Sequence, residues 1–97
     1  MDLKDFRKKL DELDSQLIET LSQRLKVSNK IAEFKLQNNL SIRDLKREQE
    51  LIKDRQEKLK AQGIEDEKFA SDLFNLILSK SRNIQNTKMN ELTKDDQ

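Results

Sequence analysis

Hydrophobic side chains recur at steps of three and four residues through the first third of the chain. This spacing matches the period of one face of an α-helix, with charged residues filling most positions between. It predicts one amphipathic helix from about Leu3 to Asn38, with Asp2 as its N-cap. The stripe runs through Leu3, Phe6, Leu10, Leu13, Leu17, Leu21, Leu25, Ser28, Ile31 and Lys35.

The length of this helix bears on the assembly. A helix of about 36 residues spans roughly 54 Å, whereas a compact domain of this chain length has a radius of gyration of ~12–13 Å. A lone subunit would leave much of the stripe in water, so the stripe predicts a homodimer with paired long helices. A simple coiled coil is the alternative, but the steps of four after Leu17 depart from a strict heptad repeat.

A second helix is predicted from about Leu45 to Ala61. Two asparagines at 38 and 39 favour a turn before it, and either Ser41 or Asp44 is suited to cap its first turn. Gly63 is suited to the position just beyond its end. The inward stripe of this helix is predicted to consist of Leu45, Glu48, Leu51, Ile52, Arg55 and Leu59.

A third helix is predicted from about Glu67 to Met89, with Asp66 as its cap. The stretch that follows is polar and is predicted to be a disordered tail. The sequence therefore predicts one helical domain over residues 1–89 and a tail over residues 90–97. The apolar centre of the third helix consists of Phe69, Leu73, Phe74, Leu76, Ile77 and Leu78, and Ile84 continues it.

Composition narrows the fold and the function. In 97 residues Pro is absent and Gly occurs once, which favours an all-α fold of three helices per subunit. The net charge of +1 argues against a nucleic-acid surface. Cys and His are both absent, which removes the thiol nucleophile, the commonest metal ligand and the commonest general base. No apolar run is long enough to span a membrane and the N-terminus is charged, so a cytoplasmic protein is expected.

Two cations share the apolar face of the first helix. Arg24 and Lys35 are 11 residues apart, which places them within about 20° of one another around the helix axis. One such cation is ordinarily a snorkelling side chain, but two aligned on an inward stripe point equally well to a ligand. Arg7 is rotated about 100° from Arg24. It is either a solvated surface residue or a contribution from the partner of an antiparallel dimer.

Polar groups on the other two helices extend this candidate site. Asp44 and Glu48 lie one turn apart on the second helix, and Ser81 and Gln85 lie one turn apart on the third. Each has an ordinary explanation: Asp44 as an N-cap, Glu48 in a solvated ion pair with Arg47, and the other two at an exposed helix end. The neighbouring charged and polar residues Arg43, Lys46, Gln49 and Glu50 are expected to be solvated.

These groups together limit the chemistry. There is no nucleophile–base pair, no metal-ligand cluster and no Gly-rich phosphate loop. Cations and neutral donors around one or two carboxylates suit a small polyanion. They also suit a reaction that needs a held conformation and charge stabilisation without proton transfer.

The order of these residues resembles the all-helical (AroQ-type) chorismate mutases, over about Leu3 to Gln85. The resemblance implies an intertwined homodimer with two equivalent sites. It also implies a Claisen rearrangement of chorismate to prephenate in aromatic amino-acid biosynthesis, with no cofactor or metal. The matching segments are R-x-x-L-D-x-L-D from Arg7, L-S-Q-R ending at Arg24, E-F-K ending at Lys35, residues 44–48 (D-L-K-R-E) and residues 81–85 (S-R-N-I-Q).

The resemblance also implies roles for single residues. Arg7 of the partner subunit and Arg24 would bind the substrate carboxylates. Lys35 and Gln85 would donate to the ether oxygen, where negative charge grows as the bond breaks. The resemblance therefore implies four catalytic residues: Arg24, Lys35, Glu48 and Gln85.

The remaining matches line the same site. The residues matching the family's acidic pair, Asp44 and Glu48, would meet the ring hydroxyl of the substrate. Arg47 and Ser81 match further substrate-binding positions. Arg82 departs from the pattern, because an apolar residue is expected there. It either points to solvent or alters the pocket.

Two other functions remain as alternatives. An isochorismate-pyruvate lyase would share the fold and the cationic pocket, but that group lacks the acidic pair that is here Asp44 and Glu48. A non-enzymatic helical dimerisation module would explain the apolar stripes but not Arg24 and Lys35 on the inner face. The mutase is therefore the reading that accounts for most residues, with chorismate as the small-molecule partner and no nucleic acid or membrane.

Overall fold

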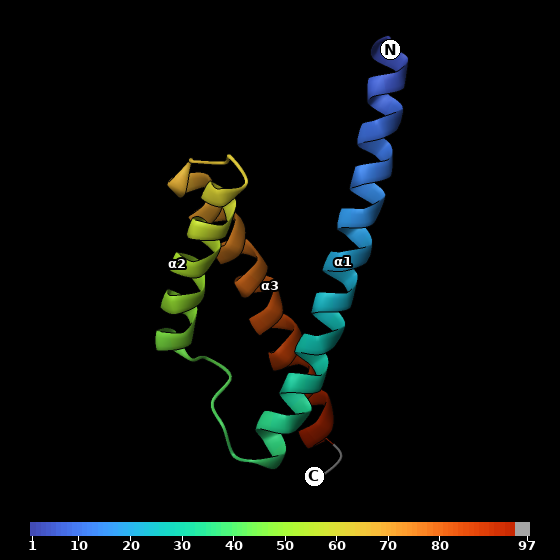
Figure 1. Ribbon diagram of the computed structural model, residues 1–97. Helices are drawn as coiled ribbons and strands as arrows, with labels where there is room; N and C mark the ends of the chain where they lie inside the picture. Colours follow the sequence, from blue (N-terminus) through green and yellow to red (C-terminus); the bar gives the residue numbers. More distant parts are fainter. Residues whose placement is uncertain (95–97) are drawn as a thin grey trace.

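The described part of the chain, residues 1–94 of this computed structural model, forms three α-helices joined by two short connections (Figure 1). They are α1 (Leu3–Gln37), α2 (Leu45–Ala61) and α3 (Glu67–Lys94). No strand occurs among residues 1–94. The prediction of an all-α fold with a very long first helix is confirmed.

Aspartates start each helix because their carboxylates accept hydrogen bonds from backbone N–H groups that have no partner in the first turn. Asp2 caps α1 in a reciprocal capping box with Asp5. Asp44, and not Ser41, caps α2 by accepting a hydrogen bond from the N–H of Arg47 at 3.0 Å. Asp66 caps α3 in the same way. The cap of α2 matters for function because it fixes where the side chains of its first turn point.

The C-terminal end of α2 agrees with the sequence prediction, whereas that of α3 does not. Gly63 adopts a φ of 88° just beyond α2, the left-handed conformation for which glycine is suited. α3 does not end at Met89 as predicted but continues to Lys94. No Pro or Gly interrupts residues 90–94, and the Thr93 hydroxyl donates to the Met89 carbonyl. The expected disordered tail is therefore helical over residues 90–94, and the rest of it lies outside the described residues.

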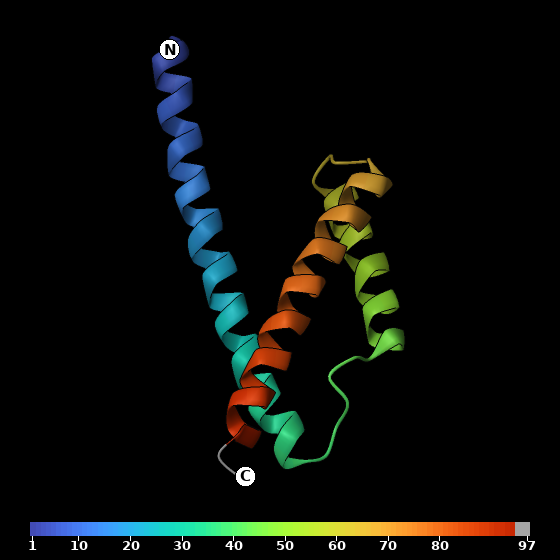
Figure 2. The same ribbon diagram turned by 180° about the vertical axis from the view of Figure 1, so that it is seen from behind.

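α3 is the element that holds the subunit together. α1 and α2 each pack against α3, and they make no direct packing contact with each other. Figures 1 and 2 show that only the C-terminal half of α1 meets α3, while its N-terminal half projects alone. The described residues extend over 61 Å with a radius of gyration of 17.2 Å, well above the value of ~12–13 Å for a compact chain of this length.

The core of one subunit is correspondingly small. Its buried apolar side chains are Ala32 of α1, Leu51 of α2, and Ala70 and Leu78 of α3. Leu45, which the stripe of α2 predicts to be inward, is 58% exposed in the first turn of the helix. Large apolar side chains also remain exposed along the N-terminal half of α1 and on α3, at Leu3, Phe6, Leu10, Leu13, Leu17, Phe69 and Leu76.

Candidate active site

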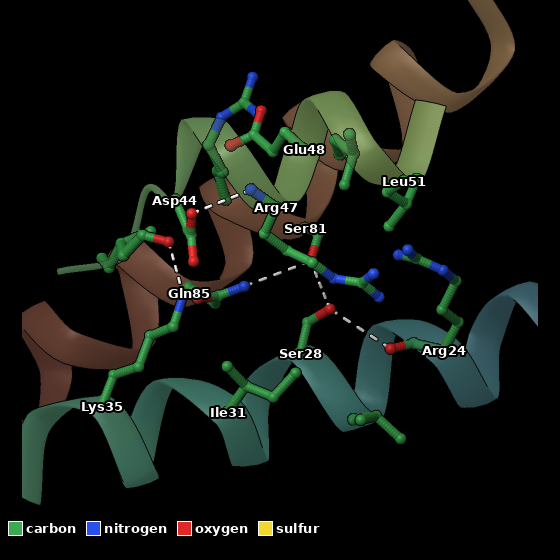
Figure 3. A pocket seen from close by; sticks show the side chains of 14 residues that line it. Arg24, Ser28, Ile31, Lys35, Asp44, Arg47, Glu48, Leu51, Ser81 and Gln85 are labelled. Atoms are coloured by element: carbon green, nitrogen blue, oxygen red, sulfur yellow. Dashed lines mark hydrogen bonds and ion pairs between the residues drawn. The ribbon is translucent and has the colours of Figure 1, made fainter. Parts of the chain in front are cut away.

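A pocket of about 280 Å³ lies where the C-terminal half of α1, the start of α2 and the middle of α3 face one another (Figure 3). Its size is close to the lower end of the range for small-molecule sites. Apolar side chains, including Ile31, Leu51 and Leu78, form much of its wall. All but one of the predicted site residues line it: Arg24, Lys35, Asp44, Arg47, Glu48, Ser81 and Gln85.

The wall between α1 and α3 is held by a chain of hydrogen bonds. The hydroxyls of Ser28 and Ser81 lie 2.5 Å apart, and both residues are buried. Small side chains here let the two helices approach closely. The Gln85 Nε2 donates to the Ser81 hydroxyl at 3.3 Å. The alternative explanation of these α3 residues, an exposed helix end, is therefore excluded, since Ser81 and Gln85 are among the most buried polar residues described.

Lys35 lies at one end of the pocket beside Gln85 (Figure 3). Its Nζ donates to the Ile42 carbonyl at 2.6 Å and to the Gln85 Oε1 at 3.3 Å. An ammonium group has three donors and an amide nitrogen has two. These contacts leave each side chain one further N–H, so Lys35 and Gln85 form a pair of donors that a ligand atom can share.

Arginines occupy the end of the pocket opposite Lys35. The guanidinium groups of Arg24 and Arg47 lie near each other there, away from Lys35 (Figure 3). Partial burial lowers the pKa of Arg24, and the nearby cations Arg55 and Arg47 lower it further. The same environment makes an anion at this end favourable, because an anion would relieve the repulsion between the cations.

Glu48 faces the pocket from α2 and is held by two arginines. Arg82 Nη1 lies 2.5 Å from Glu48 Oε1, and Arg43 Nε lies 3.6 Å from Glu48 Oε2. Arg82 therefore does not simply point to solvent but lines the pocket. Arg43 stays mostly exposed, as expected, although it contacts Glu48. The alternative explanation of Glu48, a solvated ion pair with Arg47, does not hold, because no such pair occurs among the ion pairs of the described residues.

Sequence reasoning missed the partners of Glu48, and a signal for one of them was present. Consecutive residues on a helix are rotated by about 100°. Since Ser81 faces α1, Arg82 is turned toward the flank of α3 on which α2 packs. The acceptor for Lys35, the Ile42 carbonyl, had no such signal because it depends on the path of the loop.

Arg7 is the predicted site residue that the subunit does not bring to the pocket. It lies near the start of α1, among Lys4, Lys8 and Asp11 on an exposed surface. The projecting N-terminal half of α1 separates it from α2 and α3 (Figure 2). Within one subunit it cannot contact a ligand in the pocket.

The charges of the pocket define the kind of ligand it suits. Four cationic side chains line it against two carboxylates, an excess of two positive charges. Among residues 1–94 no three acidic, His or Cys side chains gather as a metal site. No helix in the same range is long and apolar enough to cross a membrane. Fold and site together define an all-helical protein with a pocket of net positive charge, which suits a small anion.

Comparison with known proteins gives the family. The model of the family described as chorismate mutase type II matches residues 6–86. The chain belongs to this family. It is 29% identical to the chorismate mutase of Methanocaldococcus jannaschii over 92% of this chain and 89% of that protein.

Other relatives are longer proteins. The chain is 33% identical to the bifunctional chorismate mutase/prephenate dehydratase of Buchnera aphidicola subsp. Schizaphis graminum over 98% of its own length. It is 37% identical over 78% of its length to the protein of the same name from the Baizongia pistaciae subspecies. The chain spans only 24% and 20% of these two relatives. No solved structure matches the chain significantly.

Proposed function

We propose that the protein is a chorismate mutase, which rearranges chorismate to prephenate without a cofactor. The observation that carries the proposal is the layout of one pocket: the donor pair Lys35 and Gln85 at one end and the guanidinium groups of Arg24 and Arg47 at the other. Membership of the chorismate mutase type II family supports it.

The chemistry of the substrate fits this layout. Chorismate carries two carboxylates, which match the excess of two positive charges in the pocket. Arginines that bind them would hold the compact conformer in which the reacting carbon atoms meet. Chorismate also has a ring hydroxyl, for which Asp44 and Glu48 provide acceptors on the α2 side.

The reaction breaks one C–O bond of the enol ether and forms one C–C bond, and no proton has to move. Negative charge grows on the ether oxygen as the C–O bond lengthens. The free N–H groups of Lys35 and Gln85 would stabilise this charge mainly in the transition state, which raises kcat rather than affinity. A pocket without a histidine is therefore sufficient for this reaction.

We also infer that the active form is a homodimer. The N-terminal half of α1 exposes a continuous apolar stripe, with Phe6 54% and Leu10 58% exposed, and none of residues 1–94 covers it. An antiparallel partner helix would bury this stripe. It would also carry the partner's Arg7 toward the pocket and add a further cation for a substrate carboxylate.

Incubation with chorismate tests the proposed activity directly. We expect chorismate to disappear and prephenate to form, with no added metal or cofactor. Isochorismate is the comparison substrate, and we expect it to remain unchanged. Release of salicylate and pyruvate from isochorismate, with chorismate left intact, would identify the site as a lyase instead.

Mixing two inactive variants tests the shared site. Arg7→Ala and Lys35→Ala would each be nearly inactive as homodimers. A mixed dimer would hold one site with both residues intact, so unfolding and refolding the two together should restore roughly a quarter of wild-type activity. Activity would be measured after co-refolding, and sedimentation would give the mass of the particle. A monomer at micromolar concentration, or a mixture no more active than its parts, would contradict the shared site.

A further inference from the structure

The carboxylate of Glu48 is the one acid of the pocket that is paired with arginines, and we propose that Arg82 is the residue that positions it. Arg82 would hold Glu48 at the wall of the pocket and balance its charge, so that a dianion can bind beside it. The inference rests on the proposed function, because the dianion is taken to be chorismate.

The geometry singles out Arg82 as the main partner of Glu48. Its Nη1 lies 2.5 Å from Glu48 Oε1, and the two side chains are only 26% and 16% exposed. Arg43 is 3.6 Å from the other carboxylate oxygen and is 58% exposed. Solvent weakens an exposed pair of this kind strongly. Removing Arg82 would therefore leave Glu48 without an effective counter-ion.

The position of Arg82 on α3 explains why the pair matters for the shape of the pocket. Ser81 and Arg82 are adjacent, so their side chains leave α3 about 100° apart. Ser81 reaches α1 through Ser28, whereas Arg82 reaches α2 through Glu48. Since α1 and α2 do not pack against each other, these two residues join the opposite walls of the pocket through α3.

The charge balance predicts which kinetic constant responds. With Arg82 absent, an unpaired carboxylate would face a substrate that carries two negative charges. Chorismate keeps both charges in the transition state, so the repulsion acts on the ground state and the transition state alike. An interaction that is equal in both states changes KM and leaves kcat almost unaltered.

Three variants test the inference with steady-state kinetics on chorismate. Arg82→Met should raise KM about tenfold with kcat changed less than about twofold. Arg82→Lys keeps the positive charge but loses the planar guanidinium group, so its KM should lie between those of the wild type and Arg82→Met. In the double variant Arg82→Met/Glu48→Gln neither partner is left unpaired. Its KM should return toward the wild-type value, while its kcat equals that of Glu48→Gln alone.

Lys88→Met is the matched control. Lys88 also lies on α3 and pairs with an acid on a neighbouring helix, Glu33 of α1 at 3.3 Å, and its side chain is 27% exposed, but it does not line the pocket. Its KM should equal that of the wild type. An unchanged KM in Arg82→Met, or a double variant with the KM of Arg82→Met, would overturn this inference and leave the proposed function standing. A wild-type protein that forms no prephenate would remove the proposed function and this inference with it.

Discussion

Replacing Lys35 with alanine should lower kcat for chorismate by about 10²–10³-fold while the helical fold persists. The ammonium group is one of the two donors beside the expected ether oxygen, and removing one donor from a site of this kind typically costs about 3–4 kcal/mol in the transition state. The fold should survive because Lys35 is only half-buried, and its contacts in the described chain are two hydrogen bonds to Ile42 and Gln85. Turnover would be followed by the loss of chorismate absorbance, and helicity by circular dichroism.

A second lysine of the same helix provides the control. Lys30 is exposed and does not line the pocket, so Lys30→Ala changes the net charge equally and should leave kcat unaltered. Lys35→Met is a useful companion because it keeps the length and most of the volume of the side chain without its charge. If Lys35→Ala retained wild-type turnover with a native spectrum, Lys35 would have no part in the chemistry.

The sequence predicted the local structure well because local signals determine it. Aspartate caps at 2, 44 and 66 and the glycine at 63 mark helix ends through contacts within a few residues. The alignment of Arg24 with Lys35 follows from helical geometry alone. Both are brought to the same pocket in the structure.

The contacts between helices were less predictable. The pairing of Arg82 with Glu48 spans 34 residues and depends on the angle at which α2 meets α3. The buried hydroxyl pair of Ser28 and Ser81 spans 53 residues and depends on how closely α1 and α3 cross. Leu45 is a case in which the apolar period predicted burial but the side chain is exposed in the subunit. Crossing angles and helix overlap are tertiary properties that a hydrophobic period does not encode.

Replacing Gln85 with glutamate should make the reaction dependent on acid. At neutral pH the new carboxylate would accept hydrogen bonds and would pair with Lys35, whose Nζ already lies 3.3 Å from the Gln85 Oε1. The ether oxygen would then lose the donor at residue 85, and it would compete with the new carboxylate for the Lys35 ammonium group. We therefore expect kcat to fall about 10²-fold. A protonated carboxyl group has an O–H that donates in place of the amide N–H. Activity should therefore rise as the pH falls through the pKa of the introduced group.

The direction of this pH response separates a donor at residue 85 from a merely structural amide. The rate of the variant would be measured between about pH 4.5 and 8 and divided by the wild-type rate at each pH. Asn86→Asp makes the same change of amide to carboxylate at the next, exposed position of α3, and its ratio to wild type should stay constant. A constant ratio for Gln85→Glu would mean that residue 85 donates nothing in the transition state. A ratio that climbs toward acid would support the place of residue 85 beside the ether oxygen, because protonation releases Lys35 from the carboxylate and gives residue 85 an O–H that can donate.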